Sequence, residues 1–187
     1  ERYKAIFEAL PVGLYRNELG EGGQFTEANP AMARIFGAGS TEELLRHPTA
    51  DLYRDPAERQ RFSAELLAQG SVSQRELALQ TLDGQPLWGA ITAHVRQAED
   101  GRTVFDGIVE DITERKEAEQ AVRSERDFAS AIIEGLPGLF YLLSPDGRYG
   151  RWNRNLEEVL GLDTTALART HPRDLFAEDD KPRVDEV

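Results

Sequence analysis

The sequence predicts an α+β fold in which short helices cover one face of a five-stranded antiparallel sheet. Three segments rich in β-branched and aromatic residues, at 72–81, 86–97 and 103–113, are joined by short turns that contain Asp-Gly. Connections this short suit antiparallel neighbours. Two shorter strand patterns precede these segments, and three helical patterns lie between the two sets. Strands at both ends with helices in the middle indicate one mixed domain.

The first 28 residues are predicted to form a flanking helix over 1–10 and two strands at 12–18 and 23–28. A glycine-rich turn at 20–23 joins these strands. The helix is predicted from apolar residues at three- and four-residue spacing, which include Ile6, Phe7 and Leu10.

Three short helices are predicted next. Asn29 and Pro30 favour an N-cap and a first helical turn, and for Asn29 we prefer the cap to a ligand contact. This helix places Met32, Ile35 and Phe36 on one side and ends at Gly37. A second helix spans 40–45, and a third runs from Asp55 to Gly70 with an apolar stripe. The stripe consists of Phe62, Leu66 and Leu67.

The last three strands are expected to turn one face toward the helices. Alternation predicts which side chains share that face: Leu77, Leu79, Leu87, Ile91, Ala93 and Val95. Trp88 is then placed on the outer face with Ala90, Thr92 and His94. Aromatic residues on an exposed sheet face favour packing on a flanking helix or a second subunit over cofactor binding.

The strand at 103–113 runs directly into a charged segment, Asp111-Ile112-Thr113-Glu114-Arg115-Lys116. Residues 114–134 contain no Pro or Gly, and we predict a helix whose first turn Thr113 caps through its hydroxyl. Its stripe of Ala118, Val122, Ala129, Ile132 and Leu136 is interrupted by Glu125. The pattern predicts a weak coiled coil.

This order of motifs resembles the PAS domain family from end to end over about residues 1–113. The motifs are Leu10-Pro11-Val12-Gly13-Leu14-Tyr15, Asn29-Pro30-Ala31, Phe36-Gly37, Asp55-Pro56, Leu82-Asp83-Gly84, Trp88 and the Asp-Ile-Thr ending at 113. The resemblance implies a PAS fold with a small-ligand cavity between the helices and the sheet. Candidate lining residues are Met32, Ile35, Phe36, Leu52, Phe62, Leu66, Leu77, Leu79, Ile91 and Ala93.

The resemblance leaves the cofactor unknown, with a flavin or a small organic ligand as candidates. Haem is disfavoured, because haem-binding relatives carry their axial ligand on the helix that here spans 55–69. The three histidines, His47, His94 and His171, lie elsewhere. The chain has no Cys, which excludes the cysteine–flavin chemistry of the light-sensing branch and any thiolate site.

An internal repeat predicts a second, incomplete PAS domain. Phe7-Glu8-Ala9-Leu10-Pro11 recurs as Ile133-Glu134-Gly135-Leu136-Pro137, and Asn29, Gly37 and His47-Pro48 match Asn153, Gly161 and His171-Pro172. We therefore divide the chain into a flanking helix (1–10), a first PAS domain (11–113), a linker helix (114–134) and the start of a second domain (135–187). The second copy is expected to lack its last three strands, and we interpret Val187 as a boundary within a longer protein.

Composition excludes several partners. The formal net charge of −12 disfavours a nucleic acid or an anionic membrane surface. No apolar run approaches the ~20 residues that span a bilayer, and we expect a cytoplasmic segment. Phosphate loops, paired-His motifs and nucleophile motifs are absent from the sequence, so we expect no catalysis from this segment.

By resemblance, the segment is a sensory module of a bacterial signalling protein. It is expected to form a homodimer, through an interface that involves Ile6, Phe7 and Trp88. Asp111 and Thr113 are expected to relay the signal into the helix and so to an output domain of the same protein. A histidine kinase is the expected output domain, with a diguanylate cyclase or phosphodiesterase as alternatives. A ligand-free dimerisation scaffold is the alternative function.

Overall fold

The computed structural model describes residues 2–19 and 23–175, and the chain separates into two compact units, Glu1–Glu119 and Gln120–Val187. Three residues of the predicted glycine-rich turn, 20–22, lie outside the described residues. So do residues 176–187 of the predicted second domain.

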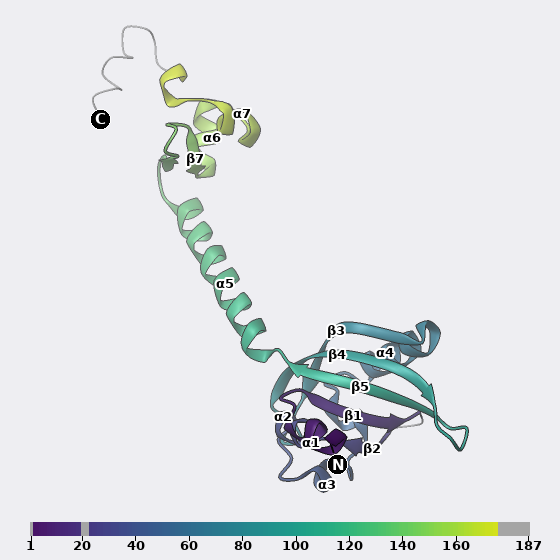
Figure 1. Cartoon of the computed structure of the whole chain (residues 1–187). Coiled ribbons are helices and arrows are strands. Elements are labelled where there is room, and N and C mark those ends of the chain that lie inside the picture. Colours follow the sequence, from purple (N-terminus) through teal and green to yellow (C-terminus); the bar gives the residue numbers. More distant parts are fainter. Residues whose placement is uncertain (1, 20–22, 176–187) are drawn as a thin grey trace. The chain divides into compact units, whose positions relative to one another are not determined.

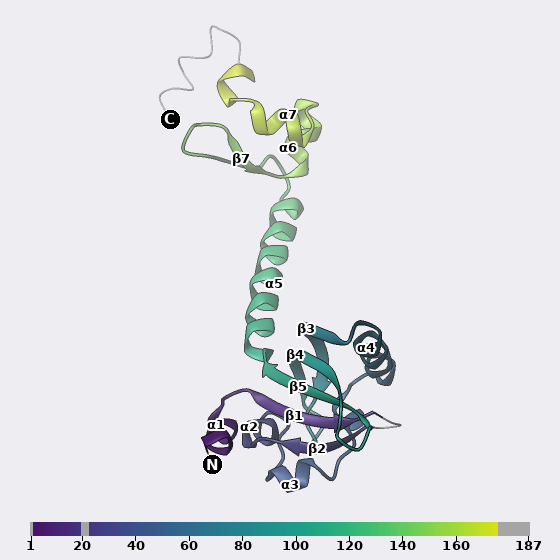
Figure 2. The same ribbon diagram turned by 45° about the vertical axis from the view of Figure 1, so that its right-hand side comes forward.

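The first unit contains the predicted five-stranded antiparallel sheet, in the strand order β2-β1-β5-β4-β3 (Figures 1 and 2). Its strands are β1 (Gly13–Glu18), β2 (Gln24–Ala28), β3 (Ser71–Gln80), β4 (Pro86–Gln97) and β5 (Thr103–Asp111). β5 ends two residues earlier than predicted, because Thr113 already begins the following helix. The N-terminal strands therefore lie beside the C-terminal strand, which places β5 in the middle of the sheet, between β1 and β4.

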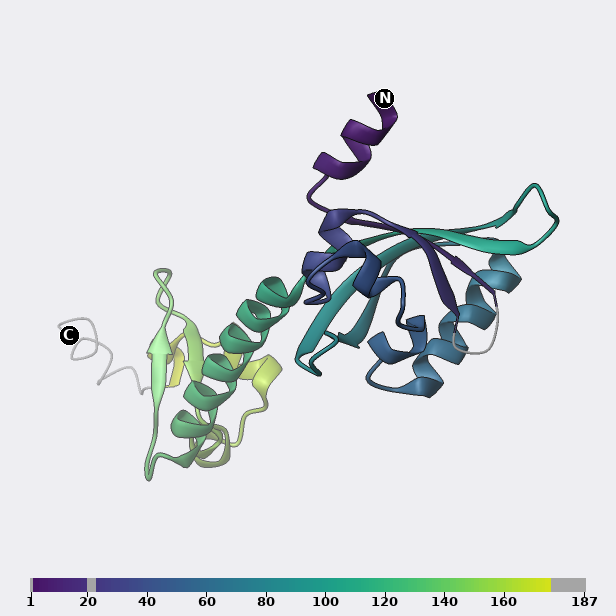
Figure 3. The same cartoon turned by 90° about the horizontal axis from the view of Figure 1, so that it is seen from below.

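Short helices pack on one face of this sheet, as Figure 3 shows for α2 and α4. The helices of the first unit are α1 (Arg2–Ala9), α2 (Pro30–Ile35), α3 (Thr41–Leu44), the 3₁₀ turn η1 (Thr49–Leu52) and α4 (Pro56–Gln69). The largest apolar side chains that are almost fully buried in this unit are Phe36, Met32, Leu44, Leu66, Leu77, Leu79 and Val109. They come from both layers, so the core lies between the helices and the inner sheet face.

Asn29 is fully buried and uses its whole side chain to join three segments. Its Oδ1 accepts hydrogen bonds from the backbone N–H of Met32 (3.0 Å), which caps α2, and of Leu14 (2.9 Å) in β1. Its Nδ2 donates to the carbonyls of Phe7 (3.1 Å) and Val12 (2.9 Å). Asn29 therefore fixes α1, β1 and α2 against one another, in addition to the capping role that the sequence predicted.

The described part of the second unit repeats the two-stranded hairpin and the capped helix that follows it in the first unit. It contains part of α5 (Thr113–Gly135), then β6 (Tyr141–Leu143), β7 (Tyr149–Trp152), α6 (Arg154–Leu160), α7 (Thr164–Arg169) and the 3₁₀ turn η2 (Pro172–Leu175). Asn153 caps α6 by accepting from Leu156, accepts from Phe140 and donates to Gly138. These bonds match those of Asn29 with Met32, Leu14 and Val12, so the internal repeat extends from the sequence to individual hydrogen bonds.

We expect Asn29→Ala to lower the free energy of unfolding of the first unit by about 3 kcal/mol, because it leaves several backbone groups without partners inside the protein. Urea unfolding in a Trp152→Phe background measures this, since Trp88 then reports on the first unit alone. Asn29→Asp keeps the acceptor and loses both donated bonds, and we expect an intermediate loss. A loss below about 1 kcal/mol in Asn29→Ala would contradict the central role of this side chain.

Candidate functional site

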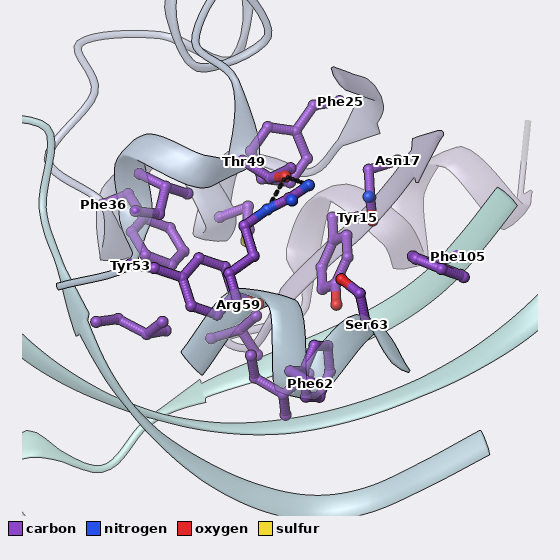
Figure 4. Close-up of a pocket in the computed structure, with 15 residues that line it drawn as sticks. Tyr15, Asn17, Phe25, Phe36, Thr49, Tyr53, Arg59, Phe62, Ser63 and Phe105 are labelled. Atoms are coloured by element: carbon purple, nitrogen blue, oxygen red, sulfur yellow. Dashed lines mark hydrogen bonds between the residues drawn. The ribbon is translucent and has the colours of Figure 1, made fainter. Parts of the chain in front are cut away.

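A cavity of about 40 Å³ lies between the inner sheet face and the helical layer of the first unit (Figure 4). Its walls come from all five strands, with Leu79 as the contribution of β3, and from the helical layer of α2, η1 and α4. The lining residues are Tyr15, Asn17, Phe25, Met32, Phe36, Thr49, Leu52, Tyr53, Arg59, Phe62, Ser63, Leu79, Ile91, Phe105 and Val109. Pockets for drug-sized ligands measure about 300–1,000 Å³, so this cavity suits a much smaller molecule.

Six of the ten sequence-predicted lining residues face the cavity: Met32, Phe36, Leu52, Phe62, Leu79 and Ile91. The other four do not line it. Leu66, Leu77 and Ala93 are buried in close packing between the layers, and Ile35 packs against the edge of the same core. Alternation along a strand shows which face a side chain occupies, but it does not separate filled core from cavity wall on that face.

None of the polar residues that line the cavity was predicted from the sequence. These are Tyr15, Asn17, Thr49, Tyr53, Arg59 and Ser63. One signal was available in β1, where the two-residue period places Tyr15 and Asn17 on the same face as buried Gly13. For Arg59 and Ser63, the apolar stripe of α4 gave no such signal, because charged and hydroxyl side chains are ordinarily assigned to the solvent face.

Tyr15 lies in the cavity wall because Gly107 leaves room for its ring. The two residues are cross-strand partners of β1 and β5. A Cβ atom built on Gly107 would lie only 2.3 Å from Cζ and 2.4 Å from the hydroxyl oxygen of Tyr15. The ring of Tyr15 also meets Phe25 edge to face, with centroids 5.8 Å apart. Glycine at 107 therefore sets the position of a polar cavity group.

We expect Gly107→Ala to displace Tyr15 and to lower the free energy of unfolding by about 1–3 kcal/mol, the usual cost of overpacking. Tyr15→Leu removes the ring that the new methyl group would meet, so the double variant should recover part of the loss. A double-mutant cycle by urea unfolding measures this coupling. Additive losses in the two variants would contradict the contact.

Burial keeps the phenols of Tyr15 and Tyr53 neutral. The pKa of Tyr15 is raised above its ordinary value first by burial and then by the nearby groups of Tyr53 and Asp106. Burial also raises the pKa of Tyr53, with Arg59 opposing this rise and Glu58 adding to it. Both hydroxyls are therefore hydrogen-bond donors over the physiological pH range.

These shifts predict a loss of stability in alkali. A raised folded-state pKa contributes stability that is complete below the unfolded value, near 10, and is lost as the pH rises toward the folded value. We expect the free energy of unfolding to fall above about pH 10. An ultraviolet phenolate titration should show fewer of the five tyrosines ionised at that pH in the folded chain than in urea. Equal titration of folded and unfolded protein would contradict burial of these two phenols.

Arg59 extends from α4 to the cavity and donates two hydrogen bonds to one hydroxyl oxygen, that of Thr49 (Figure 4). The distances to Thr49 Oγ1 are 3.2 Å from Nε and 2.9 Å from the terminal Nη2. Gly23, with a left-handed φ of 62°, lies directly against this pair. A Cβ on Gly23 would lie 2.3 Å from both Arg59 Nη2 and Thr49 Oγ1.

A second group of polar contacts joins β5 to α5. The N–H of Ile112 donates to the carbonyl of Trp88 (2.9 Å), and the hydroxyl of Thr113 accepts from the N–H of Trp88 (3.0 Å). Asp111 Oδ1 accepts from the N–H of Thr113 at 2.9 Å. The hydroxyl of Thr113 thus bonds to β4 and not to the first turn of α5, where the sequence predicted a cap, because the adjacent β4 strand supplies an unpaired donor.

The first turn of α5 covers part of the outer sheet face. Glu76 of β3 accepts hydrogen bonds from Arg115 Nη2 (2.8 Å) and Lys116, and these contacts, Lys116 first, lower the pKa of Glu76. Lys116 Nζ also lies 5.5 Å from the centre of the Trp88 ring, a cation–π contact. Ala90, predicted on the outer face with Trp88, is buried there and not exposed.

The residues predicted for a dimer interface lie on the surface of the first unit. Trp88 has 36% of its surface exposed and Ile6 has 55%. Phe7 is half-buried, and its carbonyl accepts a hydrogen bond from Asn29. No residue of α5 is buried, and Val122 and Ile132 of its predicted stripe are exposed.

Two classes of site are not found within the described residues. They contain no group of three or more His, Cys, Asp or Glu side chains placed to hold a metal ion. In the same part of the chain, no helix combines the length and apolar character needed to cross a membrane.

A family model of the PAS domain matches residues 18–114 of the chain. The match covers more than half of the sequence and includes every strand of the sheet except most of β1. The chain therefore belongs to the PAS domain family, and its first unit is a PAS sensory domain. No curated protein matches the sequence closely enough to add a relative of established function.

Solved structures share this fold at low sequence identity. The PAS domain of a protein from Colwellia psychrerythraea superposes with a TM-score of 0.52 at 19% identity, covering 60% of this chain and 96% of that one. A sensory box histidine kinase/response regulator from Burkholderia thailandensis gives 0.50 at 22%, with 69% and 98% covered. An RNA-binding light-oxygen-voltage receptor gives 0.55 at 22%, with 68% of this chain but only 37% of that chain covered. These likenesses support the fold alone.

Proposed function

We propose that this chain is a ligand-responsive tandem PAS segment of a sensor protein. A small organic molecule enters the cavity of the first domain, and β5 passes the resulting change into α5. The observation that carries this proposal is continuity: Phe105 and Val109 of β5 line the cavity, and the same strand ends at Asp111, two residues before α5 begins. One strand therefore contacts both the ligand space and the helix.

The contacts around Trp88 supply the coupling. β4 pairs with β5 along its length. The carbonyl of its Trp88 accepts a hydrogen bond from the N–H of Ile112, and the N–H of Trp88 donates to the hydroxyl of Thr113. Glu76 ties β3 to Arg115 and Lys116 in the first turn of α5. A shift of β4 against β5 consequently changes the contacts of the first turn of α5. Two arrangements of this helix relative to the sheet need differ in free energy by only a few kcal/mol to act as a switch.

The second unit is the start of another PAS domain in this proposal. The repeated hydrogen bonds of Asn29 and Asn153, each at the start of the helix after a two-stranded hairpin, support it. We retain the division into 1–10, 11–113, 114–134 and 135–187 for the flanking helix, first domain, linker and second domain. The exposed apolar side chains of α5 suit helix pairing in a homodimer.

The parent protein is proposed to be a cytoplasmic signalling protein whose output domain is a histidine kinase. A sensory box histidine kinase/response regulator among the structures that share the fold supports this choice. The cavity is too small for an isoalloxazine ring without rearrangement, so a small organic ligand is favoured over a flavin.

Filling the cavity with a side chain tests the relay without knowledge of the ligand. Ser63→Leu places a branched apolar group into the cavity from α4, and Ala64→Leu adds the same group at the exposed neighbouring position. We expect Ser63→Leu to change hydrogen exchange at the amides of Ile112 and Thr113 by at least about threefold, and Ala64→Leu to leave it unaltered.

Thr113→Val provides the second arm of this experiment, because it removes the acceptor for Trp88 while keeping the shape of the side chain. In the Ser63→Leu, Thr113→Val double variant, the change should no longer reach Lys116, whose amide bonds to Ile112 in the first turn of α5. If Ser63→Leu alters exchange near α4 alone and leaves Ile112 and Thr113 as in the wild type, the proposed relay is wrong.

A further inference from the structure

We propose that the cavity recognises a short monocarboxylate, about two to four carbons long, whose carboxylate group binds Arg59. This inference rests on the proposed function, because it names the class of ligand for the same cavity.

The charge of Arg59 has no carboxylate partner among the described residues. Its guanidinium group carries five N–H donors, and the hydrogen bonds that the described part of the chain gives it go to the single hydroxyl oxygen of Thr49. Other arginines of the first unit pair with acids, as Arg16 does with Asp106 and Arg61 with Asp55. In a chain with 34 acidic and 22 basic residues, an arginine that faces a cavity without an acidic partner is available to an anionic ligand.

The guanidinium is also held in place before any ligand arrives. The Thr49 hydroxyl anchors two of its nitrogens, and the buried backbone of Gly23 closes one side of the pair. A planar guanidinium fixed in this way presents donors in the fork geometry that matches the two oxygens of a carboxylate. Preorganisation reduces the ordering that binding would otherwise require.

Three hydroxyl groups in the same wall have no hydrogen-bond partner among the described residues: those of Tyr15, Tyr53 and Ser63. They offer donors for a carboxylate oxygen or for a keto or hydroxyl group beside it. Phe25, Phe36 and Phe62 form apolar walls against which a short carbon chain packs. The combination of one cation, a few hydroxyls and aromatic walls is complementary to a small amphipathic acid.

The volume limits the length of this acid. A cavity of about 40 Å³ has room for about three water molecules, at the 10–15 Å³ that each requires. Acetate, propionate and pyruvate are of this order of size, whereas longer fatty acids and aromatic acids require the helices to move apart. Inorganic monoanions such as nitrate share the planar oxygens but lack the carbon chain.

Chemical-shift titration of the ¹⁵N-labelled full chain tests the inference at constant ionic strength. The ligands are sodium acetate, propionate and pyruvate, the neutral isosteres acetamide and propionamide, and sodium nitrate and phosphate. We expect the carboxylates to shift the amides of Thr49 and Ser63 saturably, the amides to bind at least about tenfold more weakly, and propionate to bind better than nitrate.

Arg59→Gln should weaken acetate and propionate binding by about 10- to 100-fold. Arg61→Gln makes the same charge change two residues along α4, on an exposed side chain, and should leave binding unchanged. Arg59→Lys keeps the positive charge but loses the planar guanidinium, and it replaces Arg59→Gln in this test if that variant fails to fold. Arg59→Lys should also bind propionate more weakly than the wild type does.

The outcomes separate this inference from the proposed function. If the neutral amides bind as tightly as the acids, or Arg59→Gln and Arg61→Gln behave alike, carboxylate recognition is wrong while a ligand-binding cavity stands. Equal binding of nitrate and propionate would assign the site to inorganic anions and would also overturn the inference. If no compound shifts Thr49 or Ser63 while Ser63→Leu still alters Ile112, the monocarboxylate is wrong and the relay stands.

Discussion

The fold of the first domain depends on one buried side chain, Asn29. Its carbonyl oxygen caps α2 and receives the N–H of Leu14 in β1, while its amide nitrogen holds the carbonyls of Phe7 and Val12. A side chain with both a donor and an acceptor is needed, because two of its partners are backbone N–H donors and the other two are carbonyl acceptors. Since β1 pairs with β5, this anchor also positions the strand that leads into α5. In the second unit, Asn153 makes the equivalent hydrogen bonds between the hairpin and the start of α6.

Two glycines make room for the polar groups in the wall of the cavity. Glycines at 107 and 23 leave the space in which the Tyr15 ring and the Arg59 guanidinium lie. Polar groups in an apolar wall are costly unless they find partners, so protein interiors rarely retain them without a role. Here they line the same space as the aromatic rings of Phe25, Phe36 and Phe62, so the wall of the site offers both hydrogen-bonding groups and apolar surface.

The junction between β5 and α5 is held by hydrogen bonds and ion pairs from β3, β4 and β5. Backbone bonds of Trp88, the side chains of Asp111 and Thr113, and the ion pairs of Glu76 all lie within a few residues of the helix start. The ion pairs are exposed and individually weak. Weak contacts between a rigid sheet and a helix with no buried residue are suited to exchange between arrangements, whereas a deeply buried junction would resist it.

The sequence by itself determined the architecture, and the tertiary structure decided the chemistry of the site. Periodicity, turn residues and caps located the strands and the α-helices of the first unit, because these signals are local to the backbone, but they did not predict the 3₁₀ turn η1. The wall of the cavity was predicted only in part. Met32, Phe36 and Ile91 were found from their patterns, but Leu66 and Leu77 share those patterns and are filled core. The placement of Tyr15, Thr49 and Arg59 around one space depends on contacts between residues distant in the chain, such as Tyr15 with Gly107 and Gly23 with Arg59. Side-chain packing between distant segments decides where a core leaves room, and no local pattern encodes it.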